Sequence, residues 1–321
     1  MKGMPMCILA VFACSCGSGP EYPSGGVDAA QEMRDFVIGL SSYAKQQVPG
    51  FIVVPQNGNE LLTADLEPDG PPMQAYMSAI DGQGREDLFF GWAGDDEETP
   101  ASEKEWVLGF LDLAESHGIE VMVTDYCRTP WKVDSSYSWS AAHGFVSFAA
   151  DRRDLDDIPP YPAEPWQVNA DPVSDLAGAQ NFLYLINDQG FESADEFVVT
   201  LDETGYDMFV IDLFCCGGQL GPEQVAELAT KPGGGSRIVL CYMSIGEAED
   251  YRWYWNPSWE TNPPSWLGPE NPDWPGNYLV EYWDPGWQGI IYGSPDSYLD
   301  RIVAAGFDGV YLDKIDSFEE Y

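Results

Sequence analysis

One segment in the second half of the chain combines an apolar strand pattern with residues that could do chemistry. The stretch "RIVLCYMSIGEAEDYRWYW", residues 237–255, begins as an apolar run and then holds two glutamates, an aspartate, an arginine and several aromatic rings. Carboxyl groups just beyond a strand can act as acids, bases or nucleophiles, and aromatic faces can stack on apolar rings. The residue types therefore indicate an acid–base site with aromatic walls.

Similar polar residues follow other apolar segments, which indicates a common edge. Eight segments have strand patterns, and helical patterns such as 29–47 and 102–118 separate most of them. The eight are residues 50–58, 86–94, 119–127, 181–187, 206–214, 237–246, 277–285 and 307–316. Eight strands alternating with helices favour an α/β fold of the (β/α)8 TIM barrel type, whose active sites lie where the strands end. An open doubly wound sheet is the alternative.

The ends of the chain and one internal segment lack this pattern. Residues 1–16 resemble a bacterial lipoprotein signal peptide, with Cys16 as the expected lipidated residue and Cys14 as the alternative; an ordinary cleaved signal peptide is the other explanation. Residues 17–29 are expected to be a flexible linker, 30–321 one barrel domain, and 128–177 a long irregular connection. We expect an extracytoplasmic protein that meets the membrane only through a lipid anchor.

Composition excludes several classes of function. The chain has 54 Asp and Glu against 14 Lys and Arg, a net charge of −40, so a nucleic-acid partner is not expected. Its cysteines and two histidines lack zinc-site spacing, and neighbouring Cys215 and Cys216 could instead form a vicinal disulfide. Serine-hydrolase elbows, phosphate loops and HExxH motifs are missing from the sequence. We therefore predict no metal and no cofactor.

Several long segments together resemble one enzyme family. They are "CYMSIGEAEDYRWYW", "WPGNYLVEYWDPGWQGII", "GFDGVYLDKIDSFE", "PGFIVVPQNGNELL" and "VMVTDYC". They look like glycoside hydrolase family 114, the endo-α-1,4-polygalactosaminidases and their uncharacterised bacterial relatives. The resemblance covers nearly all of the chain from about Ala30 onward and implies a TIM barrel that cleaves α-linked, galactosamine-containing polysaccharide.

The order of these segments differs from the family order. In the family the "FLYLIN" strand comes first and "YLDKID" is fifth, whereas here the "PQNG", "EDLFF" and "VTDYC" strands precede both. The chain thus resembles a circularly permuted member, with the old ends joined through 128–177. Because the first and last strands of a barrel are neighbours, the closed sheet tolerates a cut elsewhere. A misassembled or mispredicted gene is the alternative explanation.

Glycoside hydrolysis needs two carboxyl groups that flank the scissile bond. Asp313 follows the buried run "GVYL" and resembles the catalytic aspartate of the family, so it is the expected nucleophile, with Asp316 as the fallback. By the same resemblance, Glu86 looks like the acid/base glutamate of characterised family members, although the loop around it differs. Glu247 competes for that role, because a carboxyl desolvated among Trp and Tyr side chains would have a raised pKa. Arg252 is expected to be held by Asp250 or Glu249.

The remaining candidates are expected to bind substrate, although each could equally brace the barrel mouth. They are Asn57, Asp125, Tyr126, Asp212, Tyr242, Ser244, Trp283, Asp284 and Asp316, with Trp253, Trp255, Trp259, Trp266 and Trp287 as further stacking surfaces. If the substrate carries free amines, these carboxylates would pair with its ammonium groups. We predict a monomeric, secreted, retaining endo-glycosidase. A noncatalytic carbohydrate-binding barrel, or another polysaccharide-processing hydrolase on the same fold, is the alternative.

Overall fold

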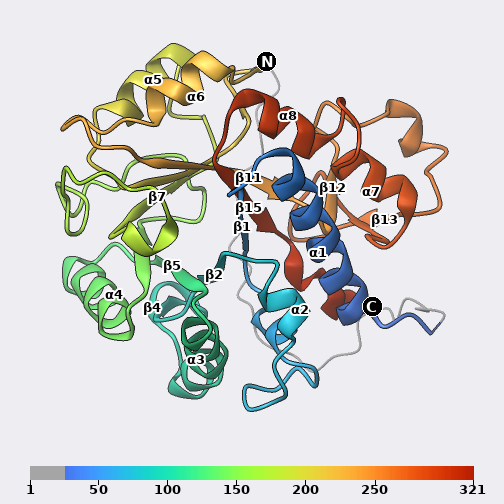
Figure 1. Cartoon of the computed structure of the whole chain (residues 1–321), viewed down its shortest axis with the longest axis horizontal. Coiled ribbons are helices and arrows are strands. Elements are labelled where there is room, and N and C mark those ends of the chain that lie inside the picture. Colours follow the sequence, from blue (N-terminus) through green and yellow to red (C-terminus); the bar gives the residue numbers. More distant parts are fainter. Residues whose placement is uncertain (1–25) are drawn as a thin grey trace.

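The computed structural model describes residues 26–321 and shows a mixed α/β protein with parallel sheets (Figure 1). The larger parallel sheet has five strands. In spatial order these are β1 (Ile52–Pro55), β15 (Gly309–Asp313), β11 (Ile238–Ser244), β8 (Met208–Ile211) and β7 (Phe182–Leu185). Their sequences are apolar and almost wholly buried, as expected for parallel strands covered on both faces.

A second parallel sheet adjoins the first at both of its edges. It consists of β2 (Gly82–Glu86), β5 (Glu120–Tyr126) and β6 (Val146–Ala150), in that order. One parallel bridge, between Gln56 and Gly84, links the end of β1 to β2. At the other edge β6 lies against β7. The eight parallel strands therefore follow one another in a consistent order.

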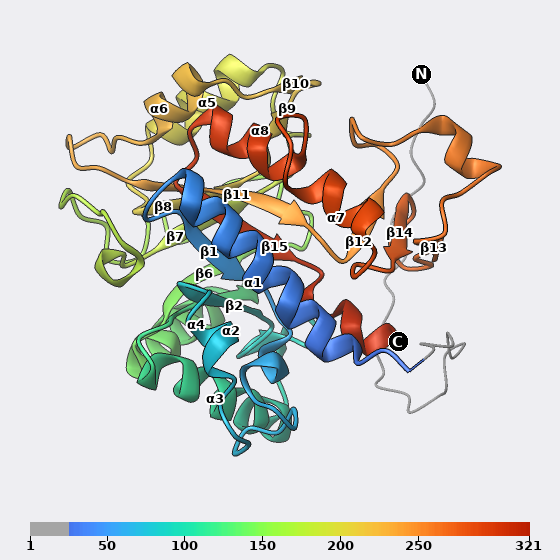
Figure 2. The ribbon, with the colours of Figure 1, turned by 45° about the vertical axis from the view of Figure 1, so that its right-hand side comes forward.

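Helices lie around the outside of these strands (Figures 1 and 2). The α-helices are α1 (Ala29–Gln47), α2 (Gln74–Met77), α3 (Ala101–Ser116), α4 (Pro130–His143), α5 (Ala194–Asp202), α6 (Pro222–Leu228), α7 (Pro285–Ile291) and α8 (Tyr298–Ala305). Four 3-10 helices, η1 (Asn59–Leu62), η2 (Leu176–Gly178), η3 (Pro257–Glu260) and η4 (Ile315–Glu320), complete the described helices. The predicted helix at 29–47 is confirmed, with Asp28 as its N-cap.

Short antiparallel pairs stand apart from the parallel strands. The hairpins are β3 (Phe90–Gly91) with β4 (Gly94–Glu98) and β9 (Phe214–Cys215) with β10 (Gly218–Gln219). A side sheet has the order β12 (Glu247–Glu249), β14 (Asn277–Val280), β13 (Leu267–Glu270). The prediction that 277–285 is one of the eight parallel strands is therefore wrong, because this segment pairs antiparallel with the chain leaving β11.

Two other predictions about the first half of the chain are wrong. The strand expected at 86–94 is β2, at 82–86, and the segment 128–177 contains α4 and β6 before it becomes irregular. The sequence of β2, "GQGRE", lacks an apolar run because its glycines make close contacts. A Cβ atom on Gly84 would lie 2.2 Å from the Tyr311 hydroxyl oxygen, so only glycine fits without displacement.

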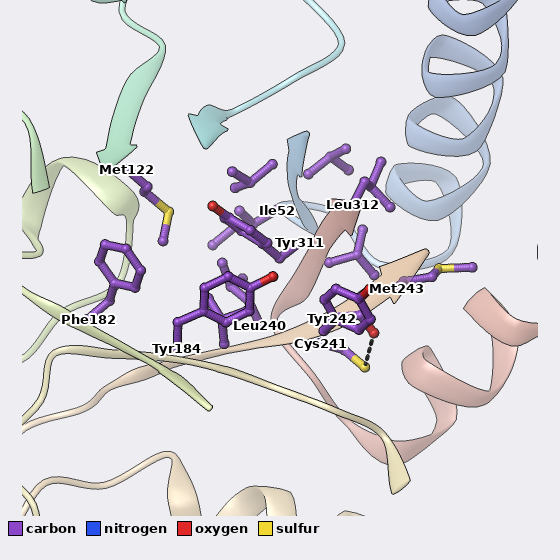
Figure 3. Packing of buried hydrophobic residues seen from close by; sticks show 14 of the residues in the cluster. Ile52, Met122, Phe182, Tyr184, Leu240, Cys241, Tyr242, Met243, Tyr311 and Leu312 are labelled. Atoms are coloured by element: carbon purple, nitrogen blue, oxygen red, sulfur yellow. Dashed lines mark hydrogen bonds between the residues drawn. The ribbon is translucent and has the colours of Figure 1, made fainter. Parts of the chain in front are cut away.

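Side chains from both parallel sheets pack into one core (Figure 3). Tyr184 of β7 and Tyr311 of β15 meet edge to face at 5.2 Å between ring centroids. Phe182 of β7 contacts Phe148 of β6 at 5.8 Å. Figure 3 shows Met122 of β5 in the same space. The interior between the strands is thus filled by side chains.

The two ends of the described chain meet. The Tyr282 hydroxyl donates to the Ala29 carbonyl at 2.8 Å, and the ring of Tyr321 lies 4.8 Å from that of Trp283. Figure 2 shows the C-terminus beside the start of α1, which packs on η4. The described residues therefore begin and finish at one place on the fold.

The predicted signal peptide 1–16, its Cys16 and linker residues 17–25 lie outside the described residues. Within 26–321, none of the helices has both the length and the apolar character needed to cross a bilayer.

Candidate active site

Two predicted catalytic carboxyl groups meet at the carboxyl ends of β15 and β2. Asp313 is the last residue of β15 and Glu86 is the last residue of β2, and Gln56, just after β1, lies between them. The Gln56 Nε2 amide donates to Glu86 Oε2 at 2.8 Å and to Asp313 Oδ1 at 3.2 Å. These two oxygens are therefore at most about 6 Å apart, and retaining glycosidases hold their carboxyl groups roughly 5 to 5.5 Å apart.

Strand register explains this meeting. Pro55 of β1 pairs with Leu312 of β15, so the residues that follow them, Gln56 and Asp313, leave the sheet side by side. On the other flank Gln56 bridges to Gly84, two residues before Glu86. Side chains two residues apart point to the same face of a strand. Gln56 therefore lies where the two parallel sheets adjoin.

Glu86 is held from three directions. Gln56 donates to Oε2, Asn57 Nδ2 donates to the same oxygen at 3.2 Å, and the Tyr126 hydroxyl donates to Oε1. The Glu86 backbone N–H in turn donates to the Asn57 side-chain oxygen at 3.1 Å. Asn57 has a φ of 58°, a left-handed conformation that asparagine tolerates better than most residues. The carboxyl group is thereby fixed in one orientation.

Asp313 is held by the hydroxyl of Tyr242, which donates to Oδ2 at 2.7 Å. Burial, and then the charge of Glu86, raise the pKa of Asp313 to about 7. Burial, and then the charge of Asp87, raise the pKa of Glu86 above its ordinary value. Two carboxyl groups in one desolvated site therefore favour a state with one proton between them. Such a pair supplies one acid and one base.

Glu247, the competing acid, is fully buried and serves as an anchor in the side sheet. Asn271 Nδ2 donates to Oε1 at 2.8 Å, Asn277 Nδ2 donates to Oε2 at 3.1 Å, and Lys314 Nζ lies 3.3 Å from Oε1. Lys314 directly follows Asp313 and has a φ of 61°. Glu247 therefore connects the side sheet to the residue beside the candidate nucleophile.

Arg252 sits in a buried ion-pair network with Glu249, one of the two partners expected from the sequence, and with Asp212 in place of Asp250, the other. Its guanidinium contacts Glu249 Oε2 at 2.6 Å and Asp212 Oδ2 at 2.7 Å. The Tyr251 hydroxyl also donates to Glu249 at 2.5 Å. Asp212, predicted to bind substrate, therefore braces the loop after β11 from the end of β8.

Three other predicted substrate-binding residues also have structural partners. Asp125 is fully buried, and its carboxylate accepts hydrogen bonds from the backbone N–H groups of Phe89 and Phe90. It also accepts one from the Ser136 hydroxyl at 2.6 Å. Burial raises the pKa of Asp125 to about 6. Asp284 is the N-cap of α7 and accepts from the Gly286 N–H at 2.6 Å. The buried Ser244 hydroxyl donates to the Glu247 carbonyl at 3.4 Å. Asp316 remains half-buried near Lys314 at 4.0 Å.

The predicted aromatic surfaces are divided between core and rim. Trp287 is fully buried, donating to the Ile245 carbonyl at 2.8 Å, and Trp266 is 6% exposed. Trp255 contacts Trp259 edge to face at 5.1 Å. Trp283 lies half-buried at the meeting point of the chain ends. Most of these rings therefore pack the side sheet against the parallel strands.

Sequence reasoning missed two residues of the site. Gln56 lies inside the quoted motif "PQNG", but a neutral amide gives no catalytic signal by itself. Arg153 follows β6 in the segment predicted to be irregular, and its guanidinium lies 4.2 Å from the Tyr126 ring centroid and 2.8 Å from Asp87 Oδ1. The Arg153 guanidinium therefore packs against the face of the Tyr126 ring, whose hydroxyl donates to Glu86.

A pair of carboxyl groups at the carboxyl edge of parallel strands is the arrangement used by glycoside hydrolases. The match to a family model agrees with this class: residues 167–321 match glycoside-hydrolase family GH114. This part of the chain is therefore assigned to family 114, as the sequence motifs indicated. It includes Asp313 but not Glu86.

Curated relatives match part of the chain. An uncharacterized protein of Thermotoga maritima is 43% identical over 139 residues, which are 43% of this chain and 39% of the relative. An uncharacterized protein of Methanocaldococcus jannaschii is 42% identical over 153 residues, 47% of this chain and 42% of the relative. A third, from Deinococcus radiodurans, is 43% identical over 116 residues, 36% of this chain and 35% of the relative. The matched part thus spans about two fifths of the length of these relatives.

Proposed function

We propose that the protein is a retaining endo-glycosidase that cleaves an α-linked, galactosamine-containing polysaccharide, in the manner of an endo-α-1,4-polygalactosaminidase. The observation that carries this proposal is the single Gln56 amide shared by Asp313 and Glu86. It holds one oxygen of each carboxyl group within about 6 Å of the other, nearer the roughly 5 to 5.5 Å separation of retaining enzymes than the roughly 6.5 to 9.5 Å of inverting ones. The family assignment of residues 167–321 supports the same class.

The two carboxyl groups would divide the reaction. Asp313, as carboxylate, attacks the anomeric carbon while Glu86 gives its proton to the departing glycosidic oxygen. Glu86 then accepts a proton from water, which attacks the glycosyl–Asp313 ester and releases the sugar with its original configuration. The Tyr242 hydroxyl favours the charged form of Asp313, because a donated hydrogen bond stabilises a carboxylate.

The acidic surroundings support an amino-sugar substrate. Glu60, Asp316 and Glu319 lie beside the end of β15, near enough to one another for their negative charges to interact. An ammonium group of a deacetylated sugar would relieve this repulsion by pairing with the carboxylates. A neutral sugar would not.

We also propose that the eight parallel strands form a closed barrel in permuted order. The Gln56–Gly84 bridge and the contact of β6 with β7 support closure. The family match to the second half of the chain, and the packing of α1 against η4, support the permutation.

Export as a lipoprotein anchored at Cys16 and a monomeric state remain proposals from the sequence. Radiolabelled palmitate should enter the wild-type protein during expression in a bacterium but not the Cys16→Ser variant. Light scattering of the purified protein should give the mass of one chain.

The decisive experiment measures reducing ends released from partly deacetylated α-1,4-galactosaminoglycan. Wild type should release them, whereas Asp313→Asn and Glu86→Gln should each lose at least about a thousandfold in kcat. Glu247→Gln serves as the matched control and should retain most of the activity if it folds. Release by Glu86→Gln but not by Glu247→Gln would overturn the acid assignment. Binding of the polymer by wild type without release would favour a noncatalytic barrel.

A further inference from the structure

The hairpin β9–β10, labelled in Figure 2, carries an unusual residue at its tip. Cys215 pairs with Gly218, so Cys216 and Gly217 form a two-residue turn in which both φ angles are positive, 54° and 80°. Turns of this type favour Asn, Asp or Gly at the first position, because other side chains are strained there. A cysteine in such a position suggests a role for its thiol.

The turn places two thiols beside a carboxylate. Cys215 is buried, Cys216 is exposed, and their Sγ atoms are 3.3 Å apart. Asp188, in the loop after β7, accepts a hydrogen bond from the Cys216 backbone N–H through Oδ2. One possible metal-ligating atom from each of the three residues lies within 4.8 Å of the other two. Among residues 26–321, these three side chains form the cluster that could hold a metal ion.

The chain order hides this cluster. Asp188 belongs to the β7 loop and the cysteines to the β8 loop, and they meet because β7 and β8 pair in parallel, with Leu185 opposite Ile211. Sequence spacing alone therefore predicted no metal site here.

We propose that Cys215, Cys216 and Asp188 bind one thiophilic divalent cation of the zinc type, with water as a fourth ligand. Two thiolates and a carboxylate suit such an ion, and each thiol releases its proton as its sulfur–metal bond forms. Zinc–sulfur bonds of about 2.3 Å in a tetrahedron separate the sulfurs by roughly 3.8 Å. The pair needs to open by only about half an ångström to reach this separation, and Cys216 at an exposed turn can supply it.

The bound ion would tie two loops together at the rim of the sheet. Asp212, which pairs with Arg252, lies three residues before Cys215, and its Oδ1 accepts from the Phe214 N–H at 2.7 Å. A cation between Asp188 and the cysteines would therefore clip the loop after β7 to the hairpin that leads on from Asp212. This inference does not depend on the proposed glycosidase activity.

Cobalt(II) titration tests the site, because thiolate ligands give Co2+ a charge-transfer band in the near ultraviolet. The protein is the full chain with Cys7, Cys14 and Cys16 replaced by serine, kept reduced and free of oxygen. We expect one equivalent of Co2+ to produce the band of two thiolates, and Zn2+ to displace it. Cys216→Asn, which suits the left-handed turn, should weaken binding at least a hundredfold, and Asp188→Asn at least tenfold.

Cys127→Ser is the control, since Cys127 is a buried cysteine on another strand end, and it should leave the Co2+ affinity unchanged within about twofold. Failure of the band to form, or a band that survives Cys216→Asn at full intensity, would overturn the proposal. Cys216→Gly, which also accepts a positive φ, replaces the asparagine variant if that variant does not fold.

Discussion

Replacing Asp313 by asparagine should stabilise the protein at neutral pH. The native pKa of this carboxyl is about 7 against an ordinary value of 3.8, because burial and the charge of Glu86 disfavour ionisation. Below 3.8 both the folded and the unfolded forms are protonated, so the full stability is present. As pH rises from 3.8 through 7, the unfolded chain releases this proton before the folded protein does. The free energy of unfolding therefore falls over this range, and the loss is complete above pH 7.

The shift sets the size of the effect. At about 1.4 kcal/mol for each pKa unit, an ionised Asp313 costs at most about 4 kcal/mol, and relaxation and partial hydration reduce this to about 2 to 4 kcal/mol. An asparagine cannot ionise and still accepts from Tyr242. At pH 8 the variant should therefore melt at least about 3 °C above wild type, given roughly 1.5 to 3 °C per kcal/mol for a domain of this size.

Circular dichroism melts at pH 8 and pH 5 test this reasoning. The advantage of Asp313→Asn should fall to less than half at pH 5; lower pH is avoided because the isoelectric point is about 4.1. Asp69→Asn, an exposed carboxylate, should change stability by less than about 0.5 kcal/mol at either pH. An Asp313→Asn variant that is no more stable than wild type at pH 8 would refute the argument. So would a difference in melting temperature between variant and wild type that is the same at pH 8 and pH 5.

Three further changes probe the surrounding contacts. Tyr126→Phe removes a donor that favours the charged form of Glu86, so the pKa of Glu86 should rise and the alkaline limb of the pH profile of kcat/KM should move to higher pH; a downward shift would contradict this. Arg252→Ala leaves two buried carboxylates unpaired and should cost about 3 to 5 kcal/mol in urea unfolding, and a cost below about 1 kcal/mol would refute the network. Asp125→Ala strips two buried amides of their acceptor and should cost about 2 to 4 kcal/mol in thermal unfolding, whereas an unchanged melting temperature would show that the contacts are dispensable.

Local sequence patterns determined much of the scaffold. The apolar runs of β8 and β11 and the helix 29–47 could be predicted because each depends on contacts or periodicity within a few residues. The position of Asp313 directly after a buried run placed it at a strand end, where barrel chemistry occurs.

Tertiary packing decided the rest. The glycine-rich strand β2 lacks alternating apolar residues because Gly84 leaves space for the Tyr311 ring of β15. Residues 277–280 belong to a side sheet because they pair with the segment that follows β11. Glu86 and Glu247 are both carboxyl groups near strand ends in the sequence. What separates them is that one meets Asp313 through Gln56, and the other is enclosed by two asparagines and a lysine. These contacts depend on the register of strands distant in the chain, which residue type and spacing do not specify.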